Sequence, residues 1–261
     1  MINFIVGAMM GDFIHQLYAV KNICLQKNDK GNLYITDGHG SDVWTFGLEK
    51  AFQDLYSLVS IQPYVNKFEI FKPQEFKEDF VNMNDWRKSV AHTHNTTGTY
   101  NKCWSEVMSE DYHFPIPQEY KWIDVCPNDD FTRNKIVIHR SKHRHNGTFP
   151  WERILNSVQG EIIFLTTSQQ EWNMFPYKHK VKLHMVSNIE QIAAAINSGK
   201  FFIGNQSAPF AIACGLDVPR LVELDSDPSK FYMDENKYSN NISWHLNNYT
   251  KFFHHNSFIK Y

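Results

Sequence analysis

Two strand–turn–helix segments at opposite ends of the chain constrain its fold most strongly. The first, GAMMGDFIHQLYAV, begins at Gly7, and the second, KFFIGNQSAPFAIACGL, begins at Lys200. In each, an apolar strand leads into a turn of small residues and then an amphipathic helix. In a parallel sheet such turns lie along the carboxyl edge, where ligands bind. The pair predicts two half-sites that face each other.

Predicted strands and helices alternate along the chain. Short apolar runs predict strands at 2–6, 32–36, 68–71, 121–125, 135–139, 161–165, 181–185, 201–203 and 220–224. Three-and-four spacing predicts helices at 12–26, 45–58, 85–90, 100–108, 188–197 and 208–214, and one that opens at Pro150. We expect Gly199 to end the helix at 188–197, and Thr167 or Ser168 to cap another. This alternation indicates an α/β fold of two Rossmann-like parallel-sheet domains facing a cleft.

A polar run separates the two halves. The segment CPNDDFTRN at 126–134 clusters Pro, Asn and Asp between apolar segments, as linkers do. We therefore expect one domain at 1–126 and a second at 127–238. The aromatic, His-rich tail at 239–261 is expected to pack back on both domains.

The composition excludes several classes of protein. The chain has 261 residues, 42% of them hydrophobic, and a net charge of -2, so it can bury a core but has no global field for nucleic acid. It contains no run of about 20 apolar residues that would cross a membrane. The start has no basic region typical of a signal peptide. We expect a soluble, cytoplasmic protein without an integral membrane segment.

Cysteine and histidine usage does not predict a metal site. The four cysteines are scattered without a CxxC pair, which argues against a zinc module and a disulfide framework. The thirteen histidines include the clusters HRSKHRH and HTH, but no HExxH motif is present. We predict no bound metal.

Three segments together resemble a known family. GDFIHQLYAV, FIGNQSAPFAIACGL and FPWERIL resemble segments of the heptosyltransferase-like, family 9-like group of GT-B glycosyltransferases, over the first thirty residues and most of 135–224. The resemblance implies a nucleotide-sugar donor, a glycan or other hydroxyl acceptor, and inversion without a metal or other cofactor. It also implies an acceptor-side N-terminal domain and a nucleotide-sugar-binding C-terminal domain.

The second segment departs from the group's signature. The signature carries an Asp, a Thr-Gly pair and a His, where this chain has Asn205, Gln206–Ser207 and Phe210. Two alternatives to sugar transfer therefore stay open. One is a sugar-nucleotide epimerase of the same architecture, and the other is a non-catalytic protein that binds a nucleotide or glycan.

Asp12 is the candidate catalytic base. It matches the group's catalytic Asp, and transfer to a hydroxyl needs a group that takes the acceptor's proton. The alternative is that Asp12 only caps the helix that it opens. The predicted acceptor-binding residues are Gly11, His15, Trp86 and Arg87, because Trp86 could stack on a sugar ring and Arg87 could donate a charge-assisted hydrogen bond to it. A buried Trp86 that anchors a helix is the alternative for that residue.

The donor's diphosphate needs local positive charge or oriented N–H groups. The loop HRSKHRHNGT supplies Arg140, Ser141, Lys142 and Arg144 beyond a strand end. The turn before the last predicted helix supplies backbone N–H groups of Gln206, Ser207 and Ala208. The alternatives are an exposed, solvated loop and a purely structural cap. The predicted nucleotide-binding residues are Thr166, Thr167, Asn205 and Glu223.

Overall fold

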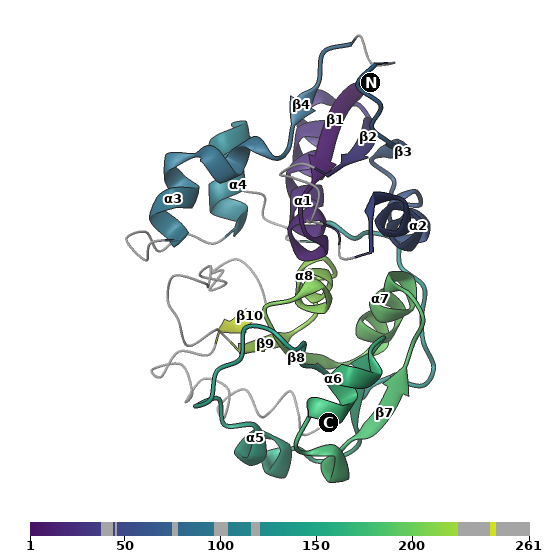
Figure 1. The fold of residues 1–261 in the computed structure, drawn as a ribbon, viewed down its shortest axis with the longest axis vertical. Helices are drawn as coiled ribbons and strands as arrows, with labels where there is room; N and C mark the ends of the chain where they lie inside the picture. The colour runs from purple at the N-terminus through teal and green to yellow at the C-terminus, as the bar shows by residue number, and fades with distance from the viewer. Residues whose placement is uncertain are drawn as a thin grey trace.

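Each half of the chain forms its own parallel sheet (Figure 1). The computed structural model describes residues 1–37, 44, 46–74, 78–96, 104–115, 121–223 and 241–243. The first sheet has the order β3-β2-β1-β4, and the second has the order β10-β9-β8-β5-β6-β7. Every strand pairing in both sheets is parallel. The predicted α/β fold with two parallel sheets is confirmed.

The elements follow the alternation that the sequence predicted. The N-terminal half contains β1 (Ile2–Gly7), α1 (Met10–Lys27), β2 (Gly31–Thr36), α2 (Leu48–Val59), β3 (Val65–Ile70), β4 (Val81–Asn82), the 3₁₀-helix η1 (Asp85–Lys88), α3 (Val90–Thr96) and α4 (Trp104–Tyr112). The C-terminal half contains β5 (Ile136–His139), α5 (Trp151–Ser157), β6 (Ile162–Thr166), α6 (Gln169–Met174), η2 (Lys178–Lys180), β7 (Lys182–Met185), α7 (Ile189–Ser198), β8 (Phe201–Asn205), α8 (Ala208–Gly215), β9 (Arg220–Glu223) and β10 (Asn241–Ser243).

The second sheet is covered on both faces. Successive side chains of a strand point to opposite faces, so Val137 of β5 joins one apolar cluster, whereas Ile136 and Ile138 join another. The cluster around Ile136 and Ile138 also holds Trp151 and Phe175, at the face of α5 and α6. Burial on both faces explains why the strands of this sheet read as continuous apolar runs rather than alternating ones.

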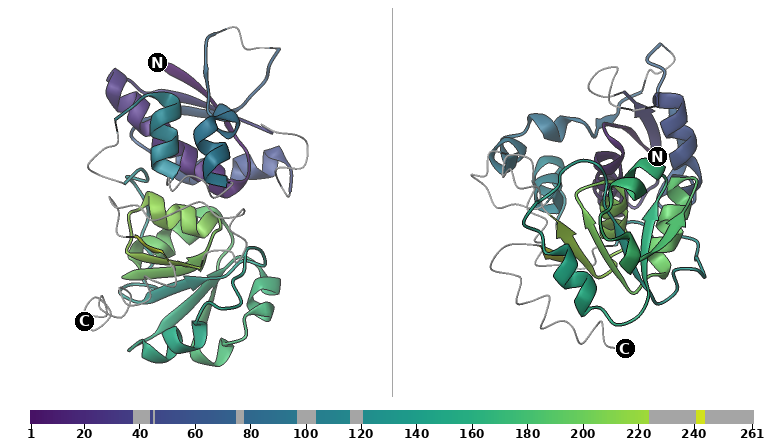
Figure 2. Two further views of the ribbon diagram at one scale, coloured as in Figure 1. Left: turned by 90° about the vertical axis from the view of Figure 1, so that its left-hand side faces the viewer. Right: turned by 60° about the horizontal axis from the view of Figure 1, so that its bottom comes forward.

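Helices from the two halves form the layer between the sheets. α1 packs on α8, and α2 packs on α7, as Figures 1 and 2 show from three directions. The larger apolar cluster runs through this layer and includes residues of both sheets. A continuous apolar interface of this kind favours a fixed relation between the halves.

The helix ends match their sequence signals. Ser168 caps α6 by accepting a hydrogen bond from the Glu171 N–H at 3.4 Å. It is one of the two residues that the sequence offered for this cap. Gly199 follows α7 directly, at the predicted stop. Pro150 stands one position before α5.

The strand predicted at 121–125 is wrong. The segment contacts α1 and α8, and among the residues that the structure describes no strand pairs with it. The backbone N–H groups of Trp122 and Ile123 both donate to the Gly215 carbonyl at 2.8 Å. The Asp124 N–H donates to the side chain of Gln62 at 2.8 Å. These contacts replace a sheet ladder.

Other differences concern short elements. The helix predicted at 85–90 is the single 3₁₀ turn η1, and the sequence analysis did not predict the two-residue β4. Of the tail at 239–261, only β10 lies within the described residues, where it pairs with β9. Its predicted packing on both domains lies outside them. No helix in the described ranges has the length and apolar character needed to cross a membrane.

We predict that Gly215→Ala destabilises the protein. A Cβ at this position would lie 2.8 Å from Ile123 Cγ1 and 2.9 Å from Trp122 Nε1, both closer than van der Waals contact allows. Forced overpacking of this kind typically costs about 1–3 kcal/mol. Urea unfolding measures the change. Gly147→Ala is the matched control, because a Cβ there meets nothing within 4 Å. Equal stability of the two variants would contradict the tight packing at α8.

Candidate functional site

The two turns that the sequence singled out lie against each other. A Cβ placed on Gly11 of α1 would be 3.6 Å from the Ala208 nitrogen and 3.7 Å from the Ser207 carbonyl carbon. Gly11 follows the first strand of one sheet, and Ser207 follows β8 of the other. The amino-terminal ends of α1 and α8 therefore meet between the two halves.

The turn before α1 is conformationally strained. Ala8 has a φ of 74°, in the left-handed region that residues with a Cβ rarely adopt. Met9 is the N-cap of α1, and no side chain caps the helix there. Asp12 thus stands at the third helical position, and the simple capping role left open by the sequence does not describe it.

Asp12 forms an ion pair with Arg87. The Nη2 of Arg87 contacts Oδ2 of Asp12, and the two side chains are 23% and 15% exposed. Arg87 belongs to η1, which follows β4, and β4 pairs with β1. The guanidinium also lies over the Trp86 ring, 4.8 Å from its centroid. The arrangement holds the carboxylate in one place at the helix start, where the helix dipole favours a negative charge.

Two predicted acceptor residues are buried. Trp86 is 1% exposed and packs edge-on against Trp104 at 4.1 Å between ring centroids. It therefore anchors η1, which is the alternative that the sequence left open. His15 stacks on Trp104, with ring centroids 5.1 Å apart and planes 5° apart. Gly11 and Arg87 remain the predicted acceptor residues that lie beside Asp12.

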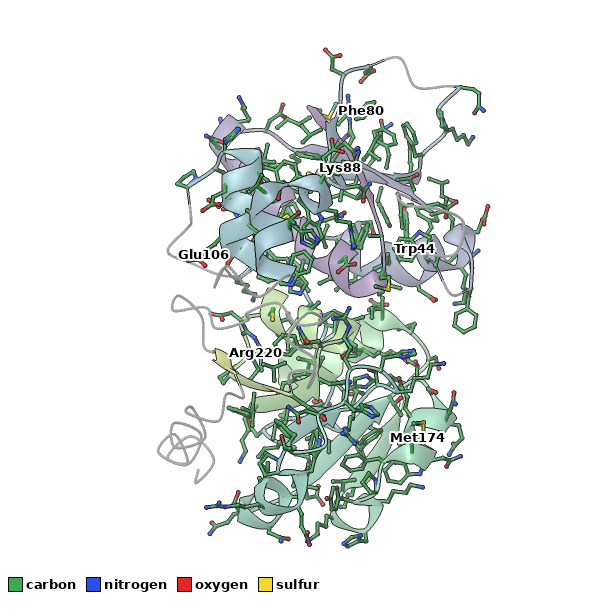
Figure 3. All side chains as sticks on the ribbon, turned by 60° about the vertical axis from the view of Figure 1, so that its left-hand side comes forward. Trp44, Phe80, Lys88, Glu106, Met174 and Arg220 are labelled. Atoms are coloured by element: carbon green, nitrogen blue, oxygen red, sulfur yellow. The ribbon has the colours of Figure 1, made fainter. Side chains whose placement is uncertain are left out.

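His15 is held uncharged. Burial, and secondarily the positive charge of Arg220, lower its pKa to about 3. Arg220 is itself buried and lies on the C-terminal half close to the boundary with the other half (Figure 3). Its Nη1 donates to the Val218 carbonyl at 3.1 Å.

The predicted donor residues share one sheet edge. β9, β8, β5 and β6 are consecutive neighbours in the second sheet, and all run in the same direction. Their carboxyl ends lead into the segments that carry the predicted donor residues, which are Glu223, Asn205 to Ala208, Arg140 to Arg144, and Thr166 with Thr167. The sheet order thus places residues distant in sequence side by side.

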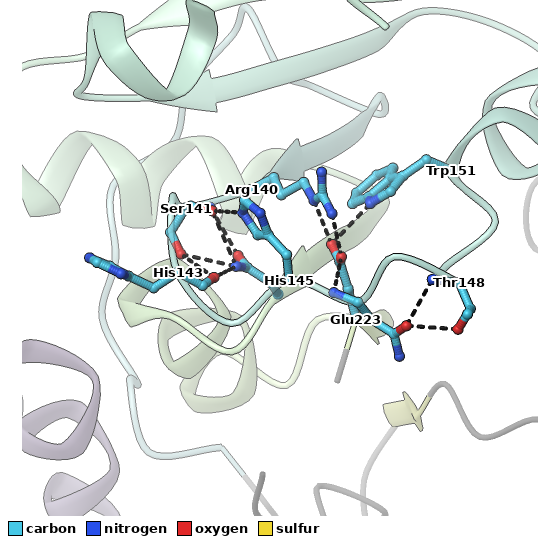
Figure 4. A network of polar contacts seen from close by, with 9 residues as sticks. Arg140, Ser141, His143, His145, Thr148, Trp151 and Glu223 are labelled. Carbon is cyan, nitrogen blue, oxygen red and sulfur yellow. Dashed lines mark hydrogen bonds and ion pairs between the residues drawn. The ribbon is translucent and has the colours of Figure 1, made fainter. Parts of the chain in front are cut away.

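Glu223 is the centre of a buried polar network (Figure 4). Its carboxylate accepts hydrogen bonds from Arg140 Nε at 2.9 Å and Nη2 at 2.7 Å, from Trp151 Nε1 at 2.9 Å and from the Asn146 N–H at 2.8 Å. A carboxylate has about four acceptor positions, so protein donors occupy all of them. Glu223 therefore ties the basic loop to α5, and this arrangement does not favour the ribose contact predicted for it.

Arg140 keeps part of its donor capacity. Glu223 engages its Nε and Nη2, and within the described ranges no hydrogen bond is made by Nη1. A guanidinium held on one side by a carboxylate presents its other edge in a fixed orientation, which suits the binding of a phosphate oxygen.

Asn205 fastens the basic loop to β8. Its Oδ1 accepts from the Ser141 N–H at 3.0 Å, and its Nδ2 donates to Ser141 Oγ at 3.0 Å and to the His143 carbonyl. The amide is thereby fully engaged in holding the loop. The structure thus shows Asn205 holding the loop, and the nucleotide contact predicted for it stays a prediction.

The turn into α8 combines donors with a buried acceptor. Ser207 is the N-cap of α8 and donates its hydroxyl to the Asn205 carbonyl at 3.0 Å. Pro209 at the second helical position supplies no N–H, which leaves Ala208 as the first helical donor. The buried Oε1 of Gln206 has no hydrogen-bond partner in the described part of the chain.

The two threonines after β6 differ in role. Thr166 is buried, donates to Glu171 Oε2 at 2.6 Å and accepts from the Ser168 N–H at 2.9 Å, so it organises the start of α6. Thr167 is exposed at the same edge. Of the two, Thr167 is the one placed to touch a ligand.

Histidine does not gather into a metal centre among the residues that the structure describes. No group of three or more His, Cys, Asp or Glu side chains there is arranged to hold an ion. His139, the first residue of the basic cluster, is buried, and its Nδ1 lies 2.9 Å from the Leu165 carbonyl oxygen.

Sequence reasoning missed the residues that hold the site together. Trp151 and Asn146 bind Glu223, and Gln16 and Asn84 form a bonded pair behind Asp12. For Gln16 one signal was available, because a polar residue four positions after Asp12 faces the same side of the helix. No comparable signal marks the other three.

The comparisons with known proteins agree with this geometry. No protein-family model and no curated protein sequence matches the chain. The heptosyltransferase WaaC of E. coli with ADP has a TM-score of 0.59 at 13% identity, and the match covers 98% of this chain and 100% of that one. The ADP-heptose lps heptosyltransferase II of E. coli gives 0.51 at 10% identity, with coverages of 94% and 91%. A family 9 glycosyl transferase of Veillonella parvula gives 0.51 at 11% identity, with coverages of 93% and 86%.

The chain has the fold of these glycosyltransferases. The GT-B-like architecture that the motifs predicted is therefore confirmed. Identities of this size establish a shared fold, and a shared fold alone does not establish a shared reaction.

We predict that Glu223→Gln destabilises the protein by about 3 kcal/mol, because breaking a buried ion pair leaves an uncompensated charge. Arg140 is 15% exposed and would lose its only ion-pair partner in the described ranges. Chemical denaturation measures the loss. Asp130→Asn is the control, since the Asp130–Arg133 pair is exposed and such pairs contribute at most about 1 kcal/mol. A Glu223 variant as stable as this control would contradict the network.

We also predict that His15 makes stability depend on pH. Its pKa is about 3 when folded and near 6.5 in the unfolded chain, so the unfolded state binds more protons between these values. The stabilising contribution is complete above about pH 6.5 and declines as the pH falls toward 3. Urea unfolding between pH 7 and 4 should show a smaller loss of stability for His15→Gln than for the wild type. Parallel curves would refute this assignment.

Proposed function

We propose that this protein is a glycosyltransferase that moves a sugar from a nucleotide-sugar donor to a hydroxyl acceptor, with inversion and without a metal. The fold it shares with heptosyltransferases supports the donor class, since the titles of those structures name ADP and ADP-heptose. An ADP-linked sugar is therefore the first donor to test.

One observation carries the proposal. Asp12 starts a helix of the N-terminal half, and its neighbour Gly11 lies against Ser207 and Ala208 at the start of a helix of the C-terminal half. A base on one half and oriented N–H groups on the other are thus brought together. Inverting transfer needs this pairing, because the acceptor's proton and the departing diphosphate lie on opposite sides of the anomeric carbon.

Asp12 is the proposed base. Its carboxylate accepts the proton of the acceptor hydroxyl as that oxygen attacks the anomeric carbon, and the bond to the diphosphate breaks. Arg87 holds the carboxylate in the first turn of α1, so that the carboxylate needs little reorientation during the reaction. Gly11, next to Asp12, lets the start of α1 approach Ser207 and Ala208 closely.

The C-terminal half is proposed to bind the leaving group. Arg140 presents its unused Nη1 edge, and Lys142 and Arg144 follow it in the same loop. The Ala208 N–H at the start of α8 adds a second donor. The orphaned Oε1 of Gln206 suits a hydroxyl or amino group of the donor, because a buried acceptor without a partner is unfavourable.

We predict that Asp12→Asn lowers kcat at least about a hundredfold, since general-base catalysis typically contributes that much or more. Donor affinity should stay within about threefold, because the amide keeps the size of the carboxylate and the donor binds the other half. Product formation and a donor-induced rise in melting temperature measure the two quantities. A variant with nearly full turnover would remove Asp12 as the base.

Two controls sharpen this test. Asp54→Asn changes an Asp of the same half that pairs with Lys50 on α2, and it should keep wild-type turnover. Incubation with donor alone should give no isomerised sugar, whereas an epimerase would form it without an acceptor. If no nucleoside diphosphate or nucleotide-sugar raises the melting temperature, the donor site is wrong.

A further inference from the structure

Behind Asp12 lies a buried amide that the proposed reaction does not use. Gln16 is 0% exposed and stands four residues after Asp12, on the same face of α1. Its Oε1 accepts the Gly7 N–H at 3.0 Å, and its Nε2 donates to Asn84 Oδ1 at 3.2 Å. Because the Gly7 partner is a backbone donor, it fixes which end of the amide points toward Asn84.

Asn84 in turn stands at the start of η1. It directly precedes this 3₁₀-helix, and its own N–H and Nδ2 both donate to Asn82 Oδ1, at 3.1 and 3.2 Å. Arg87 follows three residues later in the same short turn. A shift of Asn84 would therefore move Arg87.

The two helices are joined at two points. Asp12 contacts Arg87, and one turn further along α1 Gln16 contacts Asn84. An arginine side chain has many rotamers, and a single 3₁₀ turn has few hydrogen bonds of its own, so one contact alone fixes neither well. Trp86 anchors η1 against Trp104, and the second contact further limits the rotation of η1 against α1.

Resting on the function proposed above, we infer that Gln16 is a positioning residue for the catalytic pair, which holds Arg87 against Asp12 through Asn84. It touches neither substrate nor reacting atoms. Its contribution lies in keeping the Asp12 carboxylate oriented at the start of α1.

A stability experiment tests this inference without an activity measurement. Gln16→Met keeps the length of the side chain and removes both hydrogen bonds. In the wild-type background, we compare the single variants Asp12→Asn and Arg87→Ala with the double variant. The double variant should lose less melting temperature than the two single variants together, because the pair is coupled. In the Gln16→Met protein the losses should become additive. Unchanged coupling would overturn the inference.

Kinetics supply the second readout. Gln16→Met should lower kcat about tenfold and leave the KM for the donor within about twofold, because the effect acts on the base and not on donor binding. In an Arg87→Ala background the same change should lower kcat less than about twofold, since its effect passes through Arg87. A full tenfold effect in that background would show that Gln16 acts by another route.

Two further variants separate positioning from folding. Asn84→Ala breaks the link to η1 but keeps the Gln16–Gly7 bond. It should lower kcat as Gln16→Met does, and it replaces Gln16→Met in the test if that variant folds poorly. Gln62→Met is the matched control, because Gln62 is an equally buried amide that bonds the Leu58 and Val125 carbonyls away from Asp12. It should lose melting temperature without losing kcat. If Asp12→Asn is inactive while Gln16→Met and Asn84→Ala are fully active, only the positioning role fails; if Asp12→Asn is active, the proposed function fails.

Discussion

The packing of α1 against α8 is the constraint on which the rest of the structure depends. It brings Gly11 to Ser207 and Ala208, and the two predicted half-sites meet there. The segment that connects the halves secures this contact. Trp122 donates its ring N–H to the Ile14 carbonyl of α1, while its backbone N–H and that of Ile123 donate to the Gly215 carbonyl of α8. The connection therefore also acts as a fastening between the two helices.

Charge is distributed locally and in opposite senses on the two halves. The N-terminal half presents a carboxylate that an arginine holds in place, and the C-terminal half presents an arginine that a buried carboxylate holds in place. In each of these two pairs, one charged group limits the orientation of the other. A net charge of -2 is therefore compatible with a local cationic anchor.

Much of the fold and part of the site could be predicted from local sequence. Strands such as β1 and β8, the cap at Ser168 and the stop at Gly199 follow from periodicity and end signals, which act over a few residues. Asp12 could be named because it stands in a recognisable turn. The packing partners of His15, Trp86 and Glu223 could not be named, because burial depends on neighbours from other elements, although a buried Trp86 was one of two alternatives. The predicted strand at 121–125 failed for the same reason, since its apolar residues face helices.

The sequence by itself determined the order of strands and helices, the two turns and the residue types placed in them. Only the tertiary structure decided which of those residues meet. Strand order set Glu223 beside Arg140 and Arg87 beside Asp12, although each pair is distant in sequence. The physical reason is that helix and strand signals arise from interactions between near neighbours, whereas partners across a sheet or between helices are selected by the packing of the whole core.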